Sequence, residues 1–264
     1  MFFTEEENNL SREYLDKGYI IRPVADIEAL ESIRQQFNLL IRELLEINDY
    51  VESEVLLNNI HDYVPVAELN NFRLNIIQEI NSIELFREKY FQVAKKYIET
   101  IVGNELSMQL RINLSIQLPQ DDSSLLPVHS DIWSGDSPYE VVVWLPLVDC
   151  YGTKAMYILP PKDTDELSEE FRDKASGSSE ELYQAIQDKV EWLEVKYGEV
   201  LIFDQSLPHG NRINKEIETR WSMNCRFKEV FTPYGDKKIG EFFEPITLRA
   251  ASRRGMSYKL PDIK

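Results

Sequence analysis

The sequence predicts an α+β protein in which helices come first and a β sandwich or barrel follows. Near residue 104 the apolar residues change from three- and four-residue steps, typical of helices, to the alternation of strands. No repeat, low-complexity tract or flexible linker divides the 264 residues, which suffice for one sizeable core. We therefore expect a single domain spanning 1–264: residues 1–103 as mainly helical support, 104–231 as the β core and 232–264 as a C-terminal extension.

Three helices are expected in the first part. Asp26 is a suitable N-cap for a helix over 27–44, whose apolar residues recur at helical spacing. A second helix covers 66–81. A third covers 85–101 and ends at Gly103, a residue that favours helix C-termini.

Strands are expected after residue 104. Residues 107–118 alternate between an apolar face and a polar face that carries Asn113, Ser115 and Gln117. Amides and hydroxyls, in place of the lysines and glutamates of a solvated face, favour a cavity lining, with a wet edge as the alternative. Further strands are expected over 139–148, 155–160, 198–204 and 219–230, with a charged, helix-prone insert at 163–191.

The charge limits the kinds of partner. Forty-six acidic and 29 basic residues give a formal charge of −17, which argues against nucleic acid or an anionic membrane surface. No apolar run reaches the ~20 residues of a membrane-spanning helix, and no signal peptide is visible at the N-terminus. Cys150 and Cys225 lie in apolar runs without metal-type spacing, which favours buried free thiols in a cytoplasmic protein.

A histidine and an aspartate lie two residues apart in LPVHSDIWSG, residues 126–135. At the end of a strand, His129 and Asp131 point to the same side and can converge on one metal ion. His209 follows a buried strand and a short turn, and is the candidate third ligand. Each piece alone is as well explained by chance or by a structural hydrogen bond. The remaining histidine, His61, is interpreted as structural or solvent-exposed.

A polar strand face follows the second histidine. Arg220, Ser222, Asn224 and Arg226 share this face in the strand expected over 219–230. Two imidazoles and one carboxylate on one face of an octahedral ion leave three open positions, an arrangement suited to non-haem Fe(II). A 2-oxo acid can fill two of them and O₂ the third. A guanidinium with a hydroxyl two residues on can then hold the far carboxylate of the acid.

The order His129-x-Asp131, His209, Arg220 and Ser222 resembles that of the Fe(II)/2-oxoglutarate-dependent oxygenases. GEVLIFDQSLPHGN (198–211), WLPLVDCYGTKAMYILP (144–160) and YLDKGYIIRPVADIEALESIR (14–34) are similar to segments of the phytanoyl-CoA hydroxylase-like branch. The overall pattern looks most like oxygenases of bacterial carbohydrate-biosynthesis clusters. The resemblance covers most of residues 14–231.

The resemblance implies a fold, a cofactor set and a reaction. The fold is a double-stranded β-helix, a jelly roll, with the N-terminal helices packed on one sheet. Fe(II) is held by His129, Asp131 and His209, and the 2-oxoglutarate C5 carboxylate by Arg220 and Ser222, with Gln117 and Asn113 as further candidates. The reaction uses O₂ and releases succinate and CO₂. Hydroxylation of a small molecule, for instance a sugar derivative, is the default outcome; desaturation, ring closure and epimerisation use the same ligands. Asp131 disfavours halogenation, because halogenating relatives usually lack that carboxylate.

Several assignments stay open on the sequence. Trp133 and Tyr139 either stack on the substrate or pack structurally. Arg226 is a further candidate substrate contact and competes with Arg220 as the carboxylate clamp. Arg249, Arg253 and Arg254 form a solvated basic tail or reach an anionic group of the substrate. The insert 163–191 is a lid, an oligomer contact or decoration. Alternative functions are a cupin-type metal-dependent sugar isomerase or epimerase without 2-oxoglutarate, and a non-catalytic β-sandwich binding module. The oligomeric state is not predicted.

Overall fold

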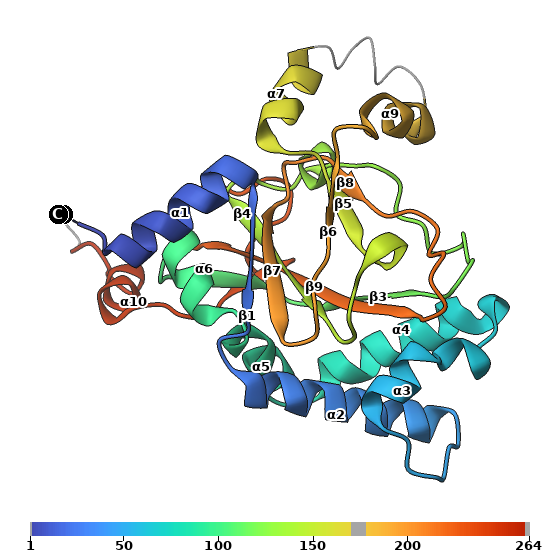
Figure 1. Cartoon of the computed structure of the whole chain (residues 1–264). Coiled ribbons are helices and arrows are strands. Elements are labelled where there is room, and N and C mark those ends of the chain that lie inside the picture. The colour runs from blue at the N-terminus through green and yellow to red at the C-terminus, as the bar shows by residue number, and fades with distance from the viewer. Residues whose placement is uncertain (1, 170–177, 262–264) are drawn as a thin grey trace.

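The computed structural model describes residues 2–169 and 178–261. Two antiparallel sheets pack against each other, and N-terminal helices cover the outer face of the larger sheet (Figure 1). The larger sheet has the order β1 (Tyr19–Pro23), β7 (Glu199–Asp204), β4 (Glu140–Pro146), β9 (Arg220–Glu229), β2 (Leu106–Gln109) and β10 (Phe243–Pro245), and β3 (Asn113–Gln117) also pairs with β9. The smaller sheet has the order β6 (Glu191–Leu193), β5 (Met156–Ile158) and β8 (His209–Gly210).

The helices confirm most of the expected periodicity. Asp26 caps α2 by accepting a hydrogen bond from the Ala29 amide at 2.9 Å, and α4 coincides with the helix expected over 66–81. The α-helices are α1 (Glu5–Lys17), α2 (Ile27–Leu44), α3 (Ser53–Asn58), α4 (Val66–Ser82), α5 (Phe86–Gln92), α6 (Lys95–Ile101), α7 (Pro161–Glu169), α9 (Ser179–Ile186) and α10 (Ala250–Met256). The described residues also form three 3₁₀ turns, η1 (Ile60–Asp62), η2 (Asp131–Ser134) and η3 (Gly152–Lys154).

Strand β4 shows how the two layers are built. All of its residues are buried, because each of its faces packs against a different layer. Val141 and Val143 belong to the core shared with the helices, whereas Val142 and Trp144 belong to the core shared with the smaller sheet. The period of two thus sends alternate side chains into two cores.

Two expected elements are each divided in the structure. The strand expected over 107–118 is broken between β2 and β3, because the Leu110 amide donates to the Phe242 carbonyl and the Ile112 amide to Asn81 Oδ1. Leu110 is exposed as a result, although alternation assigned it to the apolar face. The helix expected over 85–101 is broken between α5 and α6, where the Val93 carbonyl accepts from the Ala25 amide.

The ends and the insert also contribute to the fold. Residues 1–103 supply a strand, β1, which pairs with β7, and the C-terminal extension supplies β10, which pairs with β2. In the insert expected over 163–191, the described residues form most of α7, all of α9 and the start of β6; residues 170–177 lie outside the described residues. None of the described helices combines the length and the apolar character needed to cross a membrane.

Candidate metal centre

The backbones of His129 and His209 pair with each other, although the two residues belong to chain segments that are distant in sequence. Each amide donates to the other's carbonyl, at 3.0 and 2.8 Å, in a single antiparallel bridge. The expected end of a strand around His129 is therefore reduced to this one bridge, and Asp131 already begins η2. Convergence persists because the intervening Ser130 is extended, and its hydroxyl donates to the Ser206 carbonyl at 2.8 Å.

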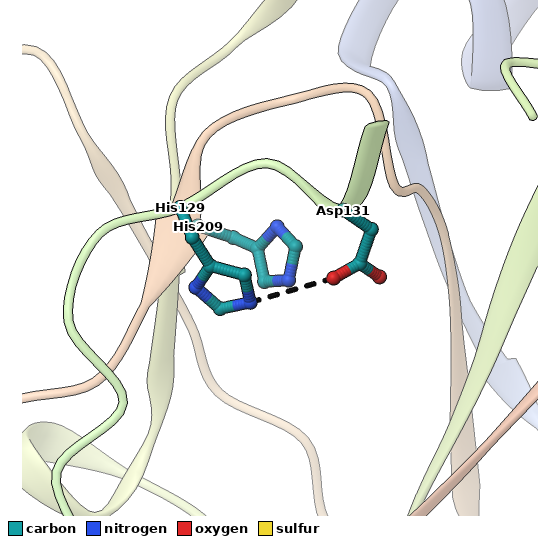
Figure 2. Close-up of side chains that lie close together, drawn as sticks. All are labelled: His129, Asp131 and His209. Atoms are coloured by element: carbon teal, nitrogen blue, oxygen red, sulfur yellow. Dashed lines mark ion pairs between the residues drawn. The ribbon is translucent and has the colours of Figure 1, made fainter. Parts of the chain in front are cut away.

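The three predicted ligands converge on one point. One candidate ligand atom from each of His129, Asp131 and His209 lies within 4.8 Å of the other two. The two rings lie 4.3 Å apart between centroids, and both face the Asp131 carboxylate (Figure 2). His129 Nε2 lies 3.5 Å from Asp131 Oδ1. The structure thus brings together residues from two segments that are distant in sequence.

Backbone carbonyls fix which nitrogen of each ring faces the site. Nδ1 of His129 donates to the Pro127 carbonyl, and Nδ1 of His209 donates to the Leu207 carbonyl, both at 2.8 Å. Since a carbonyl only accepts, each Nδ1 carries a hydrogen, so Nε2 is the nitrogen that faces the site and can bind a metal once it is unprotonated. This outer hydrogen bond is typical of metal-bound histidines.

The site favours ionised Asp131 and neutral His209. Burial, together with the nearby His129, lowers the pKa of His209 to about 4. Burial alone would raise the pKa of Asp131 and lower that of His129, but hydrogen bonds and nearby charges outweigh it in both cases. Hydrogen bonding to His129 and the charge of Arg226 bring the pKa of Asp131 below its usual range. Hydrogen bonds to Asp131 and to the Pro127 carbonyl raise the pKa of His129.

Arg226 supports the carboxylate ligand. Its Nη2 donates to Asp131 Oδ2 at 2.7 Å, and its Nε lies 3.5 Å from Asp136 Oδ1. The Nε also donates to Gln205 Oε1 at 2.9 Å. Arg226, which the sequence left as a rival clamp or a substrate contact, is therefore committed to acidic side chains of the protein.

The ligands line a cavity of about 260 Å³, which we call the metal cavity. Arg220 reaches into it from β9 and is 3% exposed; its Nη2 donates to Ser115 Oγ at 2.9 Å. Among the described residues, no carboxylate pairs with Arg220, and both its Nε and Ser222 Oγ lack a hydrogen-bond partner. The lining consists of Asn113, Ser115, Leu126, His129, Asp131, Val142, Trp144, Met156, Phe203, His209, Gly210, Asn211, Arg220, Ser222, Asn224 and Arg226.

Other predicted site residues are divided between the cavity and the rest of the molecule. Asn113 lines the metal cavity, but Gln117 does not: it is buried, and its Nε2 donates to the Arg212 carbonyl at 2.6 Å. Trp133, on η2, and Tyr139 are exposed and are not part of the lining. The expected polar faces of β3 and β9 do line the cavity, through Ser115, Ser222 and their neighbours on the same faces.

Trp144 belongs to the core shared with the smaller sheet and also lines the metal cavity. Its alternation with Val143 along the strand is visible in the sequence, but alternation cannot distinguish a side chain in the core from one in the wall of a cavity.

The other predicted residues lie outside the site. His61 Nδ1 lies 2.9 Å from Thr219 Oγ1, which agrees with its interpretation as a structural residue. Cys150 and Cys225 are buried and free, as expected. Arg249 precedes α10, which carries Arg253 and Arg254, and none of the three lines the metal cavity.

The donor set fits a divalent transition metal. Two imidazole nitrogens and one carboxylate occupy one side of the site, and the cavity adjoins them. This two-histidine, one-carboxylate arrangement with open positions is the one that non-haem Fe(II) prefers.

Comparison with known proteins identifies the fold. No family model and no curated sequence matches the chain. Among solved structures, the non-haem monooxygenase ThoJ with nickel is similar with a TM-score of 0.55 at 12% identity, over 92% of this chain and 85% of that one. The epimerase SnoN, in complex with Fe³⁺, α-ketoglutarate (2-oxoglutarate) and nogalamycin RO, gives 0.51 at 13% identity, over 87% and 86%. The α-ketoglutarate-dependent carbocyclase SnoK gives 0.52 at 16% identity, over 93% and 97%.

The chain has the fold of these non-haem enzymes. The similarity extends over most of both chains in each comparison. At such low identity the likeness concerns the fold, and what the site does has to be argued from its own residues.

Proposed function

We propose that this chain is an Fe(II)- and 2-oxoglutarate-dependent oxygenase that oxidises a small molecule. The double-stranded β-helix architecture, the single-domain organisation over 1–264 and the phytanoyl-CoA hydroxylase-like branch are parts of this proposal. Hydroxylation is the proposed outcome, and sugar derivatives are the first substrates to test. The SnoN and SnoK structures are described as an epimerase and a carbocyclase, so the same fold supports other outcomes.

The observation that carries the proposal is the state of Arg220. A buried guanidinium is costly unless an anion or several acceptors accompany it. The guanidinium of Arg220 has one hydrogen bond, to Ser115, and no acidic partner among the described residues. This is unexpected in a chain with a formal charge of −17, where acidic side chains are abundant. It lies in the same cavity as the three ligands, so a dianionic acid that chelates the metal at one end can reach Arg220 at the other.

The same observation separates the proposal from its alternatives. A cupin-type isomerase without 2-oxoglutarate has no use for an unpaired buried guanidinium beside the metal. A binding module without catalysis has no use for two histidines whose Nδ1 atoms are tied to carbonyls and whose Nε2 atoms converge.

The residues have distinct tasks in the proposed reaction. Bound Fe(II), with 2-oxoglutarate and O₂, supplies the oxidising power that takes hydrogen from a substrate C–H bond and yields succinate and CO₂. His129, Asp131 and His209 hold the ion, and Arg226 orients Asp131 through its 2.7 Å hydrogen bond. Arg220 and Ser222 fix the far carboxylate of 2-oxoglutarate. The apolar wall of the metal cavity includes Val142, Trp144 and Phe203, which limit the entry of water to the site.

The proposal is tested by anaerobic titration of the protein with Fe(II) and then 2-oxoglutarate. We expect the visible metal-to-ligand charge-transfer band of a chelated 2-oxo acid, and O₂-dependent formation of succinate. His209→Ala and Asp131→Ala are expected to abolish both. A wild-type protein that binds Fe(II) without developing the band, or a His209→Ala variant with full succinate formation, would overturn the assignment.

A further inference from the structure

A second cavity lies directly beside the metal cavity. It has a volume of about 530 Å³ and is enclosed by α4, β3 and the segment 123–126; we call it the outer cavity. Helix α4 packs against β3 here (Figure 1). Four residues line both cavities: Asn113, Ser115, Leu126 and Asn224.

The boundary between the cavities is a pair of amides. Asn113 on β3 and Asn224 on β9 are register partners, and Asn113 Nδ2 donates to Asn224 Oδ1 at 3.1 Å. This bond leaves Asn113 Oδ1 as an acceptor and Asn224 Nδ2 as a donor for a molecule that spans the boundary. A substrate in the outer cavity therefore meets hydrogen-bonding groups where the two cavities adjoin.

The outer cavity has one charged lining residue in the described chain, Arg73 on α4. Its Nη2 donates to Asn70 Oδ1 at 2.9 Å, which leaves most of its donors free, and no described acidic side chain pairs with it. The walls are otherwise apolar or neutral: Leu69, Ile77, Leu114 and Ile116 lie beside Ser123 and Ser124. A lone guanidinium in a neutral, partly apolar cavity of a strongly acidic protein favours an organic anion.

We infer that the outer cavity binds the substrate, and that the substrate is an amphipathic organic anion whose carboxylate or phosphate is held by Arg73. Its apolar part lies along α4 and β3, and the carbon to be oxidised lies at the Asn113–Asn224 boundary. This inference rests on the proposed function for its catalytic meaning, but the binding of the anion does not depend on it.

The test uses a matched pair of probes, 2-naphthoate and 2-naphthamide, which differ in charge but hardly in shape. The metal cavity is first filled with Ni(II) and 2-oxoglutarate, so that Arg220 is occupied, and each probe is then titrated by calorimetry. We expect naphthoate to bind at least about tenfold more tightly than naphthamide. Arg73→Gln is expected to remove this preference. Arg254→Gln, which removes an exposed arginine of α10, is expected to keep it.

Two results would overturn the inference: equal affinity for the two probes in the wild-type protein, or an unchanged preference in Arg73→Gln. A second variant, Leu69→Trp, fills the outer cavity from its apolar wall and is expected to exclude both probes. Circular dichroism checks that it is folded. Failure of the proposed function is recognised separately, because it appears as a missing charge-transfer band with Fe(II) and 2-oxoglutarate. If that band is absent, the probe titration is repeated without cofactors in Arg220→Gln, where the same Arg73 dependence is expected.

Discussion

Arg226 donates from Nη2 to Oδ2 of Asp131 across 2.7 Å, and both side chains are largely buried. The bond leaves Oδ1 as the oxygen nearer His129. The orientation of the Asp131 carboxylate is therefore set by a residue on β9, a strand that also carries Arg220 and Ser222.

Replacing Arg226 by methionine should destabilise the metal-free protein. Asp131 and Asp136 then lose a buried positive partner, and breaking a buried ion pair from one side costs about 3 kcal/mol. Urea unfolding of the metal-free protein measures this change. Lys17→Met, which breaks an exposed pair with Glu13, is the control and should cost less than about 0.5 kcal/mol. Equal stability of Arg226→Met and wild type would contradict the assigned role.

Replacing Arg220 by glutamine should separate binding of 2-oxoglutarate from binding of metal. Among the described residues the guanidinium donates a hydrogen bond to Ser115 and to none of the three candidate ligands, so affinity for Ni(II) should stay within about twofold of wild type. Affinity for 2-oxoglutarate should fall by about 100-fold, because a charge-assisted hydrogen bond in a buried site is lost. Calorimetry of the nickel-loaded protein gives both values, and retained 2-oxoglutarate affinity would exclude Arg220 as the clamp.

Metal binding at pH 6 should release about one proton, not two. The pKa of His209 is lowered to about 4, so His209 is already neutral, whereas the pKa of His129 is raised and its ring is protonated. A protonated ring must lose its proton to bind a metal, so affinity should increase about tenfold per pH unit until the pKa of His129 is passed. Calorimetry with Ni(II) in two buffers of different ionisation enthalpy counts the protons. A count of two at pH 6 would mean that burial does not keep His209 neutral.

Gly210→Ala should disturb the centre without touching a ligand. A Cβ there would lie 2.7 Å from the Leu126 carbonyl oxygen and 2.7 Å from the Tyr157 hydroxyl, so β8 has to move and carries His209 with it. We expect a loss of about 2 kcal/mol in unfolding free energy and weaker Ni(II) binding. Gly255→Ala, in α10 where nothing lies within 4 Å, is the control and should be neutral or slightly stabilising. Similar metal affinity in the two variants would contradict this prediction.

The sequence was informative wherever the structure depends on local pattern. The helix after Asp26, the strand from Arg220 and the convergence of His129 and Asp131 follow from spacing and capping alone. Asp131 converges with His129 even though it begins a 3₁₀ turn, because one extended residue between them is enough.

The features that the sequence did not predict depend on contacts between residues that are distant in sequence. The strand breaks at Leu110 because its amide bonds to Phe242, and the helix breaks at Val93 because its carbonyl accepts from Ala25. The pairing of Arg226 with Asp131 is of the same kind, since alternation places both arginines of β9 on one face but cannot tell which one meets a carboxylate. Short-range patterns contain no information about such bonds.

The bridge between His129 and His209 has a consequence for the order in which the protein matures. The third ligand is 80 residues beyond the first and reaches it only when the two backbone segments pair. A nascent chain that ends before β8 offers an ion only one histidine and one aspartate of the centre. In the proposed oxygenase, a complete iron site therefore exists only after these two backbone segments have paired.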